Sequence, residues 1–124
     1  MTVEELYTAI GGSYENAKKT MMMDKMISRF VVKLLDDASC QKLLDGFAAG
    51  DGAAIFEGAH ALKGVCANLG LTSLSQKAGE ITEEFRPGNS RKLSDGELEE
   101  KVSALREQYD RTIEGIRRFA AEQP

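Results

Sequence analysis

Proline, cysteine and histidine are all scarce in this chain of 124 residues. The only prolines are Pro87 and Pro124, so no residue before position 87 blocks a helix by lacking a backbone N–H. Cys40 and Cys66 form no CxxC pair, and with one histidine they do not supply the four ligands of a structural zinc site. No metal site is therefore predicted. Two free thiols would fit the reducing cytoplasm, and a disulfide between Cys40 and Cys66 is the open alternative.

Several classes of protein are excluded by other absences. No apolar run approaches the ~18 residues of a membrane span, and the N-terminus is acidic where a signal peptide is basic. The net charge is −4 without a basic block, which disfavours nucleic acid as a partner. The sequence has no nucleotide-binding glycine loop and no GxSxG elbow. Its length and its 42% hydrophobic content predict one globular domain over residues 1–124.

Apolar residues recur at the three- and four-residue spacing of amphipathic helices, and no useful segment alternates with period two. Four stripes are present. The first runs through Met23, Ile27, Phe30 and Leu34 and resumes, after a break, at Leu43, Leu44 and Phe47; the second is Ile55, Ala59, Leu62, Cys66 and Leu69; the third is Leu74, Ala78, Ile81 and Phe85; the fourth extends from Leu98 to Phe119.

Capping residues set the expected helix boundaries. Ser39, Asp51 and Thr72 each stand where a side-chain oxygen can accept from a free N–H, and Ser94 with Glu97 forms a capping box. Two shorter helices are expected over residues 2–10 and 13–19. Because each helix must bury one stripe and the loops are short, we predict an all-α fold, an antiparallel four-helix bundle with one or two additional short N-terminal helices.

One histidine stands off its helix's apolar stripe. At about 100° per residue, His60 lies roughly 140° from Ile55, on the open face. Its helical neighbours are Phe56, Lys63, Gly64 and Ala67. An ordinary surface histidine is the simplest interpretation, but glycine inside a helix costs ~1 kcal/mol relative to alanine. Gly64 instead clears space for a partner to reach the ring, and Lys63 offers a positive charge.

Two further features bear on a partner surface. Phe56 is costly on a surface unless a partner covers it. The run Met21, Met22 and Met23, with Met26, is interpreted mainly as soft core between helices, and alternatively as an adaptable docking surface. We therefore predict a partner surface at Phe56, Ala67, Met22 and Met26.

The segment from Ala59 to Gly70, AHALKGVCANLG, resembles the histidine-containing phosphotransfer (HPt) domain family. The signature of that family is H-x-L-K-G followed, after four residues, by an aliphatic residue and glycine, and every position is met. A looser similarity extends from about residue 13 to residue 85. The resemblance implies a phosphorelay intermediate of two-component signalling without ATP-dependent kinase activity of its own. By match to the signature, His60 would be the phosphorylated nucleophile, Lys63 would stabilise the phosphoryl oxygens and Gly64 would give access.

The resemblance also implies the partners. His60 would accept a phosphoryl group from a receiver-domain phospho-aspartate and pass it to another receiver, within a pathway headed by a hybrid histidine kinase. The chain would need no cofactor of its own, because the receiver is expected to bring Mg²⁺. The sequence departs from the family at Thr82, which stands where several members place a glutamine that reaches the imidazole. Thr82 is therefore the candidate for orienting His60.

Other functions remain open on the residues alone. A receiver-docking bundle with an inhibitory or scaffolding role would transfer no phosphate, although it would not need His60, Lys63 and Gly64 together. An enzyme using His60 as general base lacks a positioned carboxylate on the same helix. A purely structural bundle is the remaining alternative. A free-standing, cytoplasmic monomer is expected, because one bundle leaves no long apolar stripe uncovered.

Overall fold

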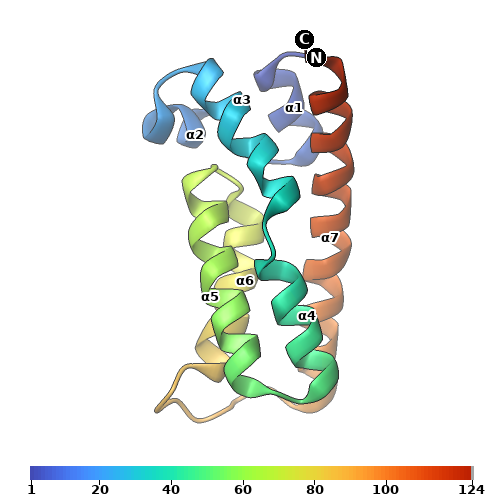
Figure 1. Cartoon of the computed structure of the whole chain (residues 1–124). Coiled ribbons are helices and arrows are strands. Elements are labelled where there is room, and N and C mark those ends of the chain that lie inside the picture. Colours follow the sequence, from blue (N-terminus) through green and yellow to red (C-terminus); the bar gives the residue numbers. More distant parts are fainter. Residues whose placement is uncertain (124) are drawn as a thin grey trace.

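Helices account for all the regular secondary structure in residues 1–123, the part of the chain that the computed structural model describes (Figure 1). The predicted all-α class is confirmed. In chain order the elements are α1 (Val3–Ile10), α2 (Tyr14–Met21), α3 (Asp24–Lys33), the 3-10 turn η1 (Leu34–Asp36), α4 (Ser39–Ala49), α5 (Gly52–Asn68), α6 (Thr72–Phe85) and α7 (Asp95–Glu122).

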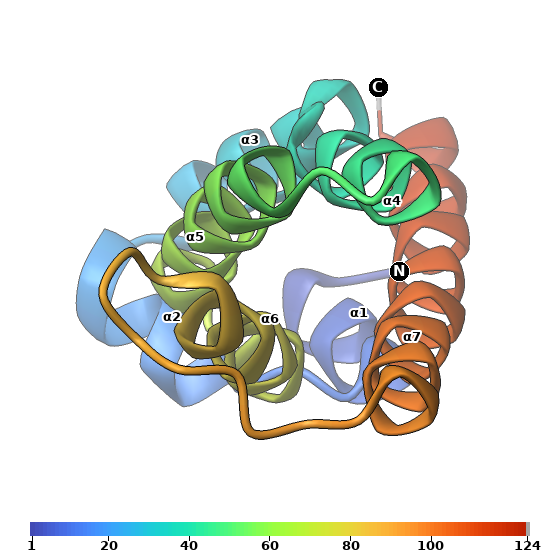
Figure 2. The same ribbon diagram turned by 90° about the horizontal axis from the view of Figure 1, so that it is seen from below.

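Four rods form the antiparallel bundle. The first is the broken rod of α3, η1 and α4, and the others are α5, α6 and the long α7, which Figure 2 shows end-on around one core. The short helices α1 and α2 cover one end of the bundle (Figure 1). The predicted architecture is confirmed, including both N-terminal helices. None of the helices over residues 1–123 is both apolar and long enough to cross a bilayer.

Two of the predicted caps are present and two are wrong. The Asp51 side chain accepts from the Ala54 N–H at 3.2 Å, and Ser94 with Glu97 makes the capping box of α7. Ser39 and Thr72 are instead the first residues of their helices, preceded by Ala38 and Leu71 without side-chain caps. At α4 the acceptor is Asp37, whose Oδ1 takes the Ser39 N–H at 2.9 Å. A carboxylate two residues earlier thus replaces the predicted serine.

The N-terminal helices are tied to the end of α5. The buried phenol of Tyr7 donates to the Leu69 carbonyl at 2.6 Å. The Ser13 N–H donates to the Gly70 carbonyl at 2.7 Å. Gly70 has φ +72°, and a Cβ there would lie 2.5 Å from the Ser13 carbonyl oxygen, so glycine is required for both conformation and contact. The chain just after α5 is therefore held by hydrogen bonds from α1 and from the residue before α2.

The stripe assigned to α3 is partly wrong. Ile27 and Leu34 are buried, but Met23 is 56% exposed and Phe30 is 38% exposed. The helix begins only at Asp24, so Met23 is its N-cap and leaves the helical face. The ring of Phe30 carries the Lys33 ammonium 5.0 Å from its centroid. The interpretation of the methionine run as core also fails at Met22, which is 76% exposed.

Candidate functional site

The orientation of α5 is set by its contact with α4. Gly58 is buried, and a Cβ there would lie 2.5 Å from the backbone nitrogen of Leu43 and 2.8 Å from the Ser39 carbonyl oxygen. The two helices therefore touch backbone to backbone at this point. Because Ala59 and Leu62 are also fully buried, the residues between them are forced outward. His60 is exposed on that outer face, as the helical periodicity predicted.

Phe56 lies one turn before His60 and contacts the imidazole. The two ring centroids are 5.4 Å apart and the planes are inclined by 42°. Side chains on a helix lean toward its N-terminus, which brings the histidine at position i over the residue at i−4. Phe56 is only partly exposed, so it is not the bare surface aromatic that the sequence indicated.

Lys63 follows His60 by three residues and is exposed. The Lys63 side chain crosses to α6. A Cβ built at Gly79 would lie 3.4 to 3.9 Å from the Cδ, Cε and Nζ atoms of Lys63. No carboxylate of residues 1–123 forms an ion pair with its ammonium group. The lysine is therefore held along its stem while its charge stays available to an incoming anion.

Gly64 opens the surface on the next turn. A Cβ at this position would meet nothing within 4 Å, so no contact inside the chain requires glycine here. Its absent side chain leaves a free approach to the imidazole along α5. This is the opposite of Gly58 and agrees with an access role.

Charge near His60 also comes from the end of α6. Glu83 and Arg86 form an ion pair with Nε to Oε2 at 2.8 Å. The hydrogen bond from Arg86 lowers the pKa of Glu83, and the charges of Arg86, Lys63 and His60 lower it further. The Arg86 guanidinium lies over the Phe56 ring, 5.5 Å from its centroid. The site thus has two cations and one carboxylate around an exposed imidazole.

The remaining predicted residues are not all brought to this place. Ala67 is exposed on α5 and lines a shallow groove with Lys63 and α6. Met22 and the half-buried Met26 belong to the α2–α3 region beyond the end of α5, which is roughly 13 Å of helix away from His60. They do not adjoin the histidine directly.

The prediction that Thr82 orients the imidazole finds no contact to support it. Thr82 is fully buried, and its hydroxyl donates to the Ala78 carbonyl at 2.8 Å within α6. No hydrogen bond joins it to His60 in the described part of the chain. A helical threonine meets its own backbone more readily than a group on another helix.

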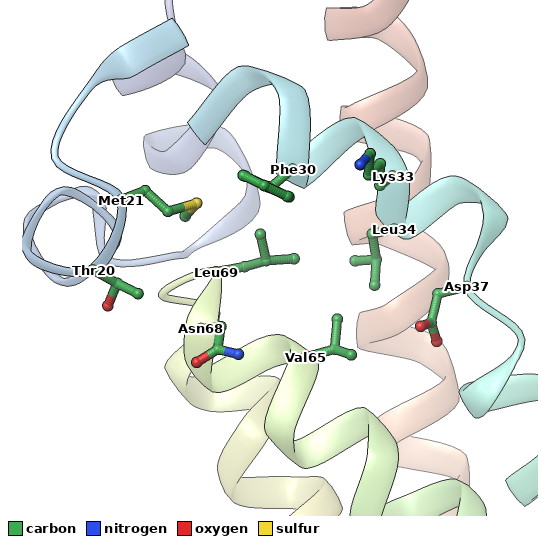
Figure 3. A pocket seen from close by; sticks show the side chains of 9 residues that line it. All are labelled: Thr20, Met21, Phe30, Lys33, Leu34, Asp37, Val65, Asn68 and Leu69. Atoms are coloured by element: carbon green, nitrogen blue, oxygen red, sulfur yellow. The ribbon is translucent and has the colours of Figure 1, made fainter. Parts of the chain in front are cut away.

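An apolar groove lies beyond the histidine along α5. It has a volume of about 470 Å³ and is bounded by α2, α3, η1 and the last turns of α5. Figure 3 shows Phe30, Leu34, Val65 and Leu69 gathered around it from these elements. The exposed Met22 and Met23 join α2 to α3 and directly follow Met21, which lines this groove.

Sequence reasoning missed Gly79, Glu83 and Arg86. None of the three belongs to an apolar stripe or to the family signature. Their place depends on which turn of α5 lies beside α6, and no local pattern encodes that. The isolated glycine at position 79, inside a helical segment, was the one available indication of a close approach.

The sequence match decides the family. A model of the Hpt domain family matches residues 26–115. This chain belongs to the Hpt domain family. The match includes all of α4, α5 and α6 and leaves α1 and α2 outside. No curated protein and no solved structure matches the chain. Hpt domains serve histidine phosphotransfer in two-component signalling; they carry phosphoryl groups rather than act as kinases, and they interact with receiver domains and histidine kinases.

Proposed function

We propose that this Hpt domain is a phosphorelay intermediate whose carrier is His60. The observation that carries the proposal is the placement of the chain's only histidine, exposed on a helix that is packed backbone to backbone against its neighbour. A rigid helix holds a nucleophile in one place, which is what transfer between two partners requires.

The transfer step needs no further catalytic group on this chain. The unprotonated ring nitrogen of neutral His60 donates its lone pair to the phosphorus of a receiver's aspartyl phosphate. The N–P bond forms while the bond between phosphorus and the aspartate oxygen breaks, and the aspartate leaves as a carboxylate. The other ring nitrogen keeps its proton or releases it to water. The reverse step delivers the group to a second receiver. Such loose transition states are stabilised mainly by position and charge.

Lys63 and Gly64 have distinct roles in this proposal. The unpaired ammonium of Lys63 lies one turn along the helix from the imidazole and would balance the charge of the phosphoryl oxygens. Gly64 leaves room for the receiver's active-site loops. We expect the receiver to supply Mg²⁺, as part of its own aspartate site. The two unpaired, buried thiols of Cys40 and Cys66 support action in the reducing cytoplasm.

The proposed receiver surface runs along α5 from His60 to the apolar groove. Gly64 and Asn68 continue the exposed face in steps of four residues, and the groove with Phe30 follows. Met22, the exposed neighbour of the groove-lining Met21, contributes a flexible apolar side chain. This modifies the predicted surface, because the groove extends it while Met26 is half-buried. An exposed apolar groove on the helix that carries the histidine fits a partner that must dock before transfer.

A radiolabelled phospho-receiver tests the proposal. The native chain is expected to take up label that is labile to acid and stable to base, and His60→Gln is expected to take up none. A second, unlabelled receiver added afterwards should remove the label. Receiver binding without any label, across a panel of receivers, would overturn the carrier function and leave the docking and scaffolding alternative. Label that persists in His60→Gln would place the acceptor elsewhere.

A further inference from the structure

Three side chains from two helices meet beside the histidine. The Phe56 ring contacts the His60 imidazole at 5.4 Å between centroids, and the Arg86 guanidinium lies over Phe56 at 5.5 Å. Arg86 is held in turn by Glu83, whose carboxylate oxygens accept from its Nε at 2.8 and 3.3 Å. We call Phe56, Arg86 and Glu83 the His60 support.

The His60 support restricts the rotamers of an imidazole that is exposed to solvent. A surface side chain exchanges among staggered rotamers on the nanosecond timescale and so occupies a productive one only part of the time. A ring packed on its flank removes some of these choices. Phe56 can serve as that ring only if it stays in place itself. Arg86 helps to hold it from outside, because a guanidinium packs flat on an aromatic face.

The end of α6 is shaped to deliver Arg86. The helix stops at Phe85, and Arg86 leaves it with extended backbone at φ −62° and ψ 130°. Its side chain is 38% exposed, and its Nε donates to both carboxylate oxygens of Glu83, one turn back. The ion pair with Glu83 therefore restricts the rotamer of Arg86 independently of its contact with Phe56. A chain of contacts leads from α6 to the imidazole on α5.

We propose that Phe56 and Arg86 are positioning residues that hold the His60 imidazole in its transfer-competent rotamer. The inference rests on the proposed function for its kinetic consequence. It reassigns Phe56, which the sequence placed on the partner surface, to a role inside the chain. If the His60 side chain were free to exchange among two or three rotamers, it would occupy the productive rotamer about a half to a third of the time. The transfer rate should then fall roughly two- to threefold.

The test separates positioning from docking. Phe56→Leu keeps an apolar side chain but loses the flat ring, and Phe56→Tyr keeps the ring as the matched control. Arg86→Gln is made together with Glu83→Gln, so that no unpaired carboxylate is left beside the phosphoryl group. Single-turnover transfer is measured at saturating phospho-receiver, and the receiver Kd is measured separately. Because the chain has one histidine, three-bond couplings of His60 report its χ1 populations without interference.

The expected result has three parts. Phe56→Leu and the Arg86/Glu83 double variant transfer about two- to threefold more slowly at saturation with unchanged Kd, and their His60 couplings average over rotamers. Phe56→Tyr keeps the native rate and couplings. A weaker Kd with an unchanged saturated rate would overturn the inference and make Phe56 a receiver contact. Native rates and couplings in both variants would also overturn it.

The two proposals fail in distinguishable ways. If the native chain takes no label from any receiver, the proposed function fails whatever the variants do. The His60 couplings then test the His60 support by themselves. A single His60 rotamer in the native chain that is lost in Phe56→Leu would sustain the positioning role, and unchanged couplings would refute it. If the native chain is labelled and the variants match it in rate and rotamer, only the support fails.

Discussion

Gly58 and Gly64 are six residues apart on α5, and they are glycine for different reasons. A methyl group at Gly58 would enter the backbone of α4, 2.5 Å from the Leu43 nitrogen. A methyl group at Gly64 would touch nothing. Both positions lose the helix propensity of alanine. At Gly58 the lost helix propensity is offset by a helix contact that the fold needs. At Gly64 no contact inside the chain offsets it. Because Gly64 also lies one turn from the exposed His60, its open surface fits access by a partner.

The largest effect is expected at the outer face, from His60→Gln. The exposed imidazole makes no hydrogen bond with the rest of residues 1–123, so the free energy of unfolding should stay within about 0.5 kcal/mol of the native value. Phosphoryl acceptance should be abolished. Urea denaturation and label transfer measure the two quantities. A destabilised variant would show that the outer face carries structure after all.

Gly58→Ala should change stability and leave phosphoryl acceptance intact, the converse of His60→Gln. Gly58→Ala overpacks the α4–α5 contact, and we expect it to lower the free energy of unfolding by about 2 kcal/mol despite the gain in helix propensity. Folded Gly58→Ala should still accept label, because the outer face is unchanged. The midpoint of urea denaturation is the measurement. Native stability in this variant would mean that α4 and α5 do not touch as described.

Gly64→Ala sharpens the comparison because stability and function should move in opposite directions. The unobstructed methyl group should raise the free energy of unfolding by about 0.5–1 kcal/mol. It should also slow transfer by roughly tenfold, since misplacing reacting groups by 1 Å costs on the order of 100-fold. Gly96→Ala, at another open position on α7, is the matched control with unchanged transfer. Equal transfer by both variants would refute the access role.

Lys63→Ala should have a smaller effect on the same face. An exposed charge interaction is worth up to about 1 kcal/mol, so transfer should slow by about fivefold and the loss should shrink at high salt. Lys101→Ala makes the same change of net charge at a lysine that already pairs with Glu80 at 3.0 Å. Its transfer rate should match that of the native chain. A loss of equal size in both variants would indicate general electrostatic attraction of the receiver instead.

The buried and exposed faces of α5 were the part of the site that could be predicted from sequence. The faces of α5 follow from 100° per residue alone, so the exposure of His60 and the burial of Leu62 were accessible without a structure. The stripe failed at Met23 because that residue is the N-cap of α3, outside the helix, and sequence patterns locate helix ends only to within one or two residues. It failed at Phe30, inside the helix, because that side chain borders the apolar groove and not the core.

The contacts between helices were the inaccessible part. Arg86 reaches Phe56 only because α6 ends where it does and lies beside that turn of α5. Thr82 was aligned with a glutamine of the family, but its hydroxyl is used by its own helix. Both outcomes depend on tertiary placement and not on spacing along the chain. The family signature located the histidine without locating its surroundings.

The buried face of α5 should become visible at alkaline pH through Cys66. Burial raises the pKa of this thiol from 9.0 to about 12, and burial does the same for Cys40. At pH 7 both thiols are neutral in the folded and unfolded states, so they leave stability unchanged. Above pH 9 the unfolded chain releases protons that the folded chain keeps, so stability falls as pH rises.

Between pH 9 and 10 the two thiols together should lower the free energy of unfolding by about 2 kcal/mol in the native chain, and Cys66→Ala should lose about 1 kcal/mol less over this interval. The phenols of Tyr7 and Tyr109, whose pKa values burial also raises, begin to ionise in the unfolded chain as the pH approaches 10, and they add the same loss to both proteins. The measurement is urea denaturation at pH 7, 9 and 10, and the slope matters rather than the absolute stability, which the smaller side chain lowers by itself. Equal slopes in the two proteins would mean that the Cys66 thiol ionises as readily in the folded chain as in the unfolded one, so that this face of α5 admits water. A loss that is smaller by about 1 kcal/mol in Cys66→Ala, with label transfer at neutral pH unchanged, would show that one helix keeps a dry face for the fold and a separate face for the partner.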